Sequence, residues 1–187
     1  MLTEEALRGY LGPETERINL EHHYWIKDTF IDKIGRMAPN LRELCLRRMN
    51  LSNRAFTCIA AELKDLRKID ISYCPNIHVS GFKILMDNNK YLTHIQVSNS
   101  SDAVNNEIVQ RIANLEHDLQ FLDMSFAINV TDEGMTHFKG KVHPIEKLFV
   151  NGMTGITAQG LHDLITTCPQ TLKVFEASLM SQEGMTG

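Results

Sequence analysis

A pattern that returns about every 26 residues constrains the fold of this chain more than any other feature of its sequence. The pattern is LxxLxL with aliphatic substitutes, and successive copies begin 25 to 27 residues apart. A period of about 20 to 30 residues is typical of solenoids, in which each repeat packs only against its neighbours. The seven copies begin at Thr15, Leu41, Leu66, Leu92, Leu119, Ile145 and Leu172.

A second element recurs in phase with the first and has the composition of a helix start. It consists of an aliphatic residue, a capping residue, two polar residues, a small residue and a large apolar one, as in LSNRAF at Leu51 and VTDEGM at Val130. A Ser, Thr or Asn side chain in the second place can accept a hydrogen bond from a free N–H group of the first helical turn. The expected capping residues are Thr3, Ser52, Asn105, Thr131, Thr157 and Ser181.

Each repeat is therefore predicted to form a strand, a turn and a helix with one buried face. Neither half can bury its apolar side alone, so the repeats must stack with all strands in one parallel sheet. Strands lie about 4.8 Å apart and packed helices about 8 to 10 Å apart, so the stack is expected to bend with the sheet inside. This predicts a single domain over residues 1–187, with about seven repeats of roughly 26 residues and both ends inside a repeat.

Two stretches resemble a known family. LRKIDISYCPNIHVSGFKIL (66–85) and TTCPQTLKVFEAS (166–178) are similar to the cysteine-containing subclass of leucine-rich repeats, found in F-box leucine-rich-repeat proteins and the antagonist-of-mitotic-exit-network group. The resemblance extends over essentially the whole chain. It implies a leucine-rich-repeat solenoid, an α/β right-handed superhelix with a concave parallel sheet and convex helices, and binding of another protein on the concave face.

The chain departs from this family in two respects. The namesake cysteine is kept only at Cys74, and its place in the other repeats is taken by His23, Met49, Ser100, Ala127 and Met153. Residues 1–14, which precede the first copy, read as half a repeat rather than as an F-box. The resemblance therefore does not carry attachment to a ubiquitin ligase onto these residues.

Charge and cysteine usage limit the expected partners. Nineteen basic and 23 acidic side chains give a net charge of -4, without the overall positive field that attracts nucleic acid or an anionic membrane. The four cysteines form no CxxC pair and are expected to be buried free thiols. The start of the chain is acidic, and no apolar run approaches the ~20 residues of a membrane span, so we expect a cytoplasmic protein without nucleic-acid or membrane partners.

Possible catalytic and ligand-binding residues have simpler explanations. Asp70 and Asp123 should share one column of the sheet at a spacing suited to paired carboxylates, but a flat strand face offers no cleft. His22 and His23 lack a third metal ligand, and no base is placed to activate Cys45. Glycines at four helix starts, Gly81, Gly134, Gly155 and Gly160, are interpreted as packing and turn residues. We therefore expect no catalytic residue, cofactor site or metal site.

Residues between the aliphatic positions of each copy are expected to face the concave side. Basic residues gather there on the early repeats and aromatic residues on the middle and late ones, which are the residue types that carry interface energy. The alternative is that the charges are solvated and some aromatic rings pack into turns. The predicted partner-binding residues are Arg42, Arg47, Arg48, Arg67, Lys68, Tyr73, Phe121, Phe126 and Phe149.

Two functions compete on this sequence. The first is a protein-binding module, similar to the substrate-recognition repeats of F-box proteins and with ubiquitin-ligase components as one kind of partner. The second is a structural subunit of a large cytosolic or multi-subunit cytoskeletal assembly, with contacts on several faces. An enzyme is the least favoured class because no catalytic constellation can be assembled.

Overall fold

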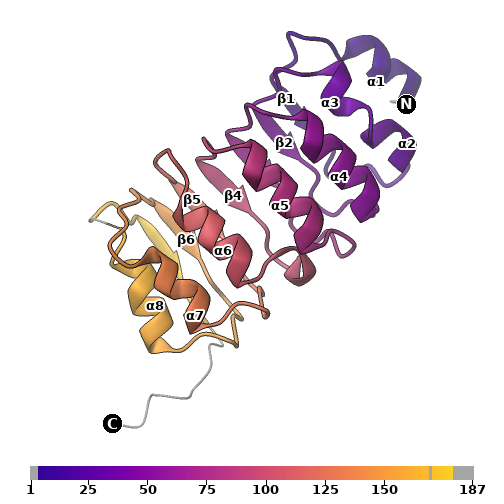
Figure 1. Ribbon diagram of the computed structural model, residues 1–187. Helices are drawn as coiled ribbons and strands as arrows, with labels where there is room; N and C mark the ends of the chain where they lie inside the picture. Colours follow the sequence, from indigo (N-terminus) through magenta and orange to yellow (C-terminus); the bar gives the residue numbers. More distant parts are fainter. Residues whose placement is uncertain (1–3, 169, 179–187) are drawn as a thin grey trace.

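The computed structural model describes residues 4–168 and 170–178 as a stack of strand and helix units (Figure 1). Seven parallel strands form one open sheet in the order β1-β2-β3-β4-β5-β6-β7, so each strand pairs with its neighbours in sequence. This confirms the predicted α/β solenoid. The strands are β1 (Arg17–Asn19), β2 (Glu43–Cys45), β3 (Lys68–Asp70), β4 (His94–Gln96), β5 (Phe121–Asp123), β6 (Lys147–Phe149) and β7 (Val174–Glu176).

The middle residue of each strand from β1 to β6 points into the core. Leu44 pairs in register with Ile69, and Ile95 with Leu122, so the aliphatic positions form one continuous buried column. Successive strand residues point to opposite sides, and the first and third residues therefore lie on the other surface of the sheet. We call that surface the sheet face. At β7 the equivalent core residue, Phe175, is 41% exposed.

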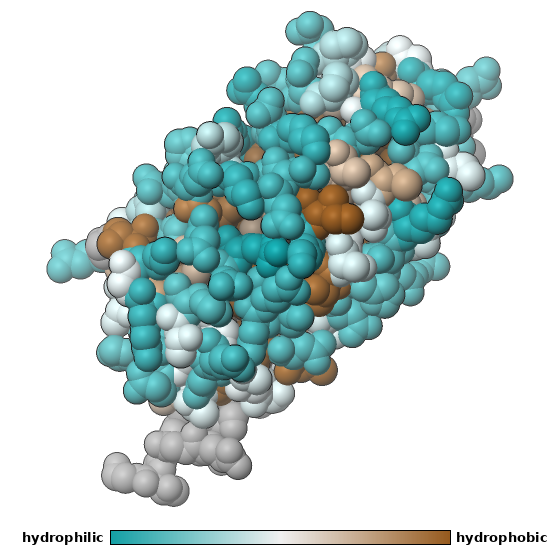
Figure 2. All heavy atoms as spheres, in the orientation of Figure 1, coloured by the Kyte–Doolittle hydropathy of each residue, from teal (hydrophilic) through white to brown (hydrophobic). Residues whose placement is uncertain are grey.

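Helices cover the opposite side of the sheet, in front of the strands in Figure 1. They vary in length, and two repeats also contain a 3-10 turn: η1 (Ser101–Ala103) precedes the helix of its repeat, and η2 (Thr136–Phe138) directly follows one. Figure 2 shows that this helical side is mainly hydrophilic, with small, separate hydrophobic patches. The helices are α1 (Glu4–Tyr10), α2 (Asp28–Ile31), α3 (Ile34–Met37), α4 (Asn53–Glu62), α5 (Val79–Asn88), α6 (Asn106–Ala113), α7 (Asp132–Met135) and α8 (Ala158–Ile165).

Three of the predicted helix caps are confirmed. The side chains of Ser52, Asn105 and Thr157 accept hydrogen bonds from backbone N–H groups of α4, α6 and α8 at 3.1 to 3.2 Å. Thr131 is the N-cap residue of α7, as predicted, but its side chain makes no cap bond; its hydroxyl instead accepts from the Asn106 amide at 2.9 Å. Thr3 and Ser181 lie outside the described residues.

Polar side chains at four helix starts also reach forward to the backbone N–H at the start of the next helix. The pairs are Asp28 with Ser52, Asn53 with His78, Asn106 with Thr131 and Asp132 with Thr157. Glycines make room for three of these contacts: a Cβ at Gly81 or Gly134 would lie 2.6 or 2.5 Å from the accepting oxygen, and one at Gly160 would collide with Asp132. These glycines are therefore packing residues, as the sequence predicts.

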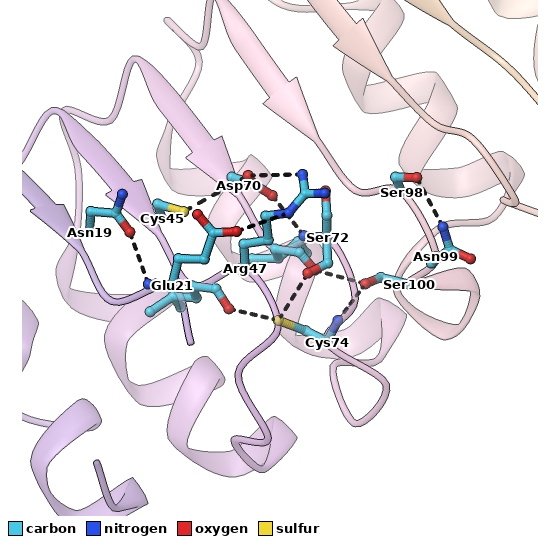
Figure 3. A network of polar contacts seen from close by, with 12 residues as sticks. Asn19, Glu21, Cys45, Arg47, Asp70, Ser72, Cys74, Ser98, Asn99 and Ser100 are labelled. Carbon is cyan, nitrogen blue, oxygen red and sulfur yellow. Dashed lines mark hydrogen bonds and ion pairs between the residues drawn. The ribbon is translucent and has the colours of Figure 1, made fainter. Parts of the chain in front are cut away.

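The namesake cysteine position links neighbouring repeats. The buried Cys74 thiol donates to the carbonyl oxygen of Leu46 at 3.0 Å, and Ser100 makes the equivalent bond to Ile71 at 2.7 Å (Figure 3). In each case the donor satisfies a backbone acceptor one repeat earlier, which explains why serine can replace cysteine here. The expectation of buried thiols holds for Cys74 alone, because Cys45, Cys58 and Cys168 are partly exposed.

Thiol labelling tests this placement. We expect Cys74 to react with N-ethylmaleimide only after unfolding, because its side chain is 0% exposed and burial raises its pKa to about 12, whereas the thiolate is the reactive form. Residue-resolved mass spectrometry with and without urea would measure this. The partly exposed Cys58 serves as the internal control that labels in the native protein. Rapid modification of native Cys74 would show that its repeat is placed wrongly.

Candidate partner-binding surface

The sheet face consists of two columns of side chains, one from the first and one from the third residue of each strand. Strand register places Glu43 beside Lys68, and His94 beside Phe121, in the first column. Asp70, Gln96 and Asp123 follow one another in the second. The residues predicted to lie between the aliphatic positions are therefore brought to one surface.

On the early repeats this surface is an ion-pair network rather than a free basic patch. Glu43 binds Arg17 at 2.6 Å and Lys68 at 3.0 Å. Burial alone would raise the pKa of Glu43, but the hydrogen bonds from Lys68 and Arg17 outweigh it and lower that pKa. Exposed pairs of this kind typically contribute only about 0 to 1 kcal/mol each. Their main effect is to neutralise most of the positive charge that the sequence places here.

Of the four arginines predicted to bind a partner, two are also paired with carboxylates and two are not. Arg47 lies 3.3 Å from Glu21 and 3.9 Å from Asp70, and Arg42 lies 3.8 Å from Glu16. Within the described part of the chain, no carboxylate lies within salt-bridge distance of Arg48 or Arg67. These two guanidinium groups are therefore the ones left to pair with a ligand.

Tyrosine rings contact both unpaired arginines, Arg48 and Arg67, and also Arg47. The guanidinium carbons of Arg47 and Arg48 lie 5.2 and 5.0 Å from the centre of the Tyr73 ring, and that of Arg67 lies 4.9 Å from the centre of Tyr91. All three are cation–π distances. Tyr73 therefore belongs with the arginines and not with the later aromatic group to which the sequence assigned it. Tyr91 was missed because it precedes its LxxLxL copy and so falls outside the pattern.

An aromatic stack crosses three neighbouring strands of the middle and late repeats. His94 on β4 stacks on Phe121 at 5.9 Å between ring centres and an interplanar angle of 11°, and Phe121 meets Phe149 at 5.5 Å. Burial, reinforced by the charge of Lys68, lowers the pKa of His94, which favours an uncharged ring at neutral pH. Phe126 is not part of this stack. It lies 42% exposed beyond the strand end, against Gly152.

The carboxylates that could suggest catalysis are engaged by the backbone. Asp70 accepts from the Ser72 N–H at 2.8 Å (Figure 3). Asp123 accepts from the Ser125 N–H at 2.9 Å, so each carboxylate closes the turn after its strand. Burial raises the pKa of Asp123 and raises that of Cys45 to about 11, and the Cys45 thiol lies 3.8 Å from Asp70. At neutral pH the Cys45 sulfur is a protonated thiol rather than an activated nucleophile.

The described residues carry neither a metal-ligand cluster nor a membrane-spanning helix. They contain no group of three or more His, Cys, Asp or Glu side chains arranged to hold a metal ion. None of their helices is long and apolar enough to cross a membrane.

Fold and surface together define an open α/β solenoid whose sheet carries a charged network and an aromatic stack. No protein-family model matches the sequence, and no curated protein is significantly similar to it. Among solved structures the chain is similar to one described as "Crystal structure of Rad7 and Elc1 complex in yeast", with 15% identity and a TM-score of 0.46. The match covers 96% of this chain but 60% of that one, so the chain spans less than two thirds of the length of that protein.

Proposed function

We propose that this chain is a non-catalytic protein-binding module that holds a partner protein against its sheet face. The observation that carries the proposal is the aromatic stack of His94, Phe121 and Phe149, which lies partly exposed across three strands beside the arginine network. Aromatic and arginine side chains are enriched among residues that dominate binding energy. The rigid sheet holds these rings in place before binding, which reduces the entropy lost on association.

The class of repeat and the kind of partner are proposed from the sequence resemblance. Cys74 and Ser100 bond to the preceding repeat as a structural cysteine column would, which supports the cysteine-containing class of leucine-rich repeats. We accordingly propose a cytoplasmic recognition role of the kind found in F-box leucine-rich-repeat proteins, with ubiquitin-ligase components among the candidate partners.

The second candidate is a structural subunit of a large cytosolic or cytoskeletal assembly, which would contact its neighbours on several faces. Copurification separates the two functions: a recognition module should bring down ligase components, whereas a structural subunit should bring down one stoichiometric cytosolic or cytoskeletal complex.

Binding kinetics with a copurified partner test the use of the sheet face. We expect Phe121→Ala and Phe149→Ala each to speed dissociation by about 30-fold, which corresponds to the ~2 kcal/mol of a buried aromatic anchor. Arg67→Glu should mainly slow association and change its salt dependence, because exposed charges steer encounter. Surface plasmon resonance at two salt concentrations would measure both rates.

The matched control is Lys64→Glu, which reverses an exposed charge outside the sheet strands. It should leave both rates within about twofold if binding uses the sheet face, since it touches no predicted contact. If substitutions on the helical side weaken binding and those at Phe121 and Phe149 do not, the structural-subunit function becomes the better explanation.

A further inference from the structure

One residue in each of six successive repeats has a left-handed backbone. We call this set the left-handed row: His22, Arg48, Tyr73, Asn99, Phe126 and Gly152, with φ values between 55° and 64°. Each lies two positions after the last buried residue of its LxxLxL copy, where the chain turns back towards the core. The row therefore runs along the edge of the sheet face at the carboxyl ends of the strands.

Tertiary hydrogen bonds impose this conformation. The backbone N–H of each row residue donates to a carbonyl oxygen in the next repeat: Arg48 to Ser72 at 2.9 Å, Tyr73 to Ser98 at 2.8 Å and Phe126 to Asn151 at 2.7 Å. These bonds continue the ladder of the sheet by one more rung. The following residue, such as Cys74 or Ala127, must then turn inward and is buried. A left-handed residue meets both requirements.

The side chains of the row are not what this backbone favours. Glycine adopts a left-handed conformation without a steric penalty, asparagine tolerates it, and bulky residues there are outliers. Gly152 and Asn99 follow that rule, but Tyr73 and Phe126 do not, and they remain 39% and 42% exposed. Burial in the core therefore does not account for these two rings. Bulky residues held in strained conformations are concentrated at functional sites.

We infer that the left-handed row is the contact strip for an extended acidic segment of the partner protein, an inference that rests on the proposed function. The row contains no acidic residue, and among the described residues Arg48 has no carboxylate partner. Arg48 is held on the Tyr73 ring beside Arg47, leaving its guanidinium donors for a carboxylate, which they can bind through two parallel hydrogen bonds. The charge of the strip thus selects an acidic ligand.

The spacing of the row adds a second requirement. Tyr73 and Phe126 lie two repeats apart, which is about 10 Å at the strand spacing of a parallel sheet. An extended peptide advances about 3.3 Å per residue, so about three residues separate the two positions. The Arg48 guanidinium lies on the Tyr73 ring, so the peptide's acidic side chain would bind near Tyr73. About three residues away, in either direction along the peptide, an apolar side chain would then contact Phe126.

Selection from a phage-displayed library of random peptides of about 12 residues would test this, followed by fluorescence anisotropy with the selected peptides. We expect the native protein to enrich peptides with Asp or Glu about three residues from a large apolar residue. Arg48→Glu, Tyr73→Asn and Phe126→Asn should each weaken binding by tenfold or more. Asn99 already occupies the same backbone position, so the two asparagine variants should keep the native circular dichroism spectrum and melting temperature.

Two results would overturn the inference. One is enrichment of basic or purely apolar peptides, or no enrichment. The other is binding of the selected peptides that is unchanged in all three row variants. If row variants leave partner binding intact but Phe121→Ala abolishes it, the strip is refuted while the proposed function stands. If partner binding survives substitution of both regions, the proposed function fails as well.

Discussion

Leu122→Ala is expected to lower the free energy of unfolding by about 2 to 5 kcal/mol, the range for removing a fully buried leucine. Leu122 is 0% exposed, and strand register places it between Ile95 and Leu148 in the central column of the core. Each repeat packs mainly on its neighbours, so a cavity at β5 weakens both of its interfaces. Urea unfolding followed by circular dichroism would measure the loss.

The matched control is Lys147→Ala on the next strand, where the side chain points to the exposed sheet face. A surface substitution of this kind should change stability by less than about 0.5 kcal/mol. Equal losses for the two variants would contradict the assignment of core and sheet face.

Asn89→Ala is the second substitution for which we expect a large loss, about 3 kcal/mol or more, because each unsatisfied buried polar group costs about 1 to 3 kcal/mol. Asn89 is 0% exposed at the end of α5, and its side chain makes three hydrogen bonds to the backbone. Its amide nitrogen donates to the carbonyl oxygens of Leu63 and Leu85 at 3.1 and 2.9 Å, and its oxygen accepts from the Leu66 N–H at 2.8 Å. Three backbone groups lose their partner when it is removed.

Asn114 provides a control at the same position of the next helix. It also follows the last helical residue, but it is exposed and its amide makes one bond, to Gln110 at 2.8 Å. Asn114→Ala should therefore cost less than about 1 kcal/mol in the same unfolding measurement, because water can replace the lost bond. A loss as large as that of Asn89→Ala would mean that the Asn89 bonds between repeats contribute little.

The periodicity of the sequence determined the number, order and direction of the strands and the side on which each strand residue lies. This was possible because LxxLxL and the helix-start element depend on local chain geometry and on burial of one face. The buried column through Leu44 and Leu122 and the caps at Ser52, Asn105 and Thr157 follow from those rules.

The tertiary structure alone decided which side chains meet across repeats. Spacing placed Tyr73 among the later aromatics, but its ring lies on Arg47 and Arg48, and Arg47 is partly neutralised by Glu21. Such contacts depend on side-chain direction between residues about 25 positions apart, which a pattern within one repeat does not contain.

The left-handed backbone at Arg48, Tyr73 and Phe126 has the same origin. Local sequence favours glycine or asparagine in that conformation, and these residues give no sign of it. Hydrogen bonds to the next repeat impose it, because they continue the sheet ladder while the following residue turns into the core. Local propensity thus fixed the repeat, and contacts between repeats fixed the surface that it presents.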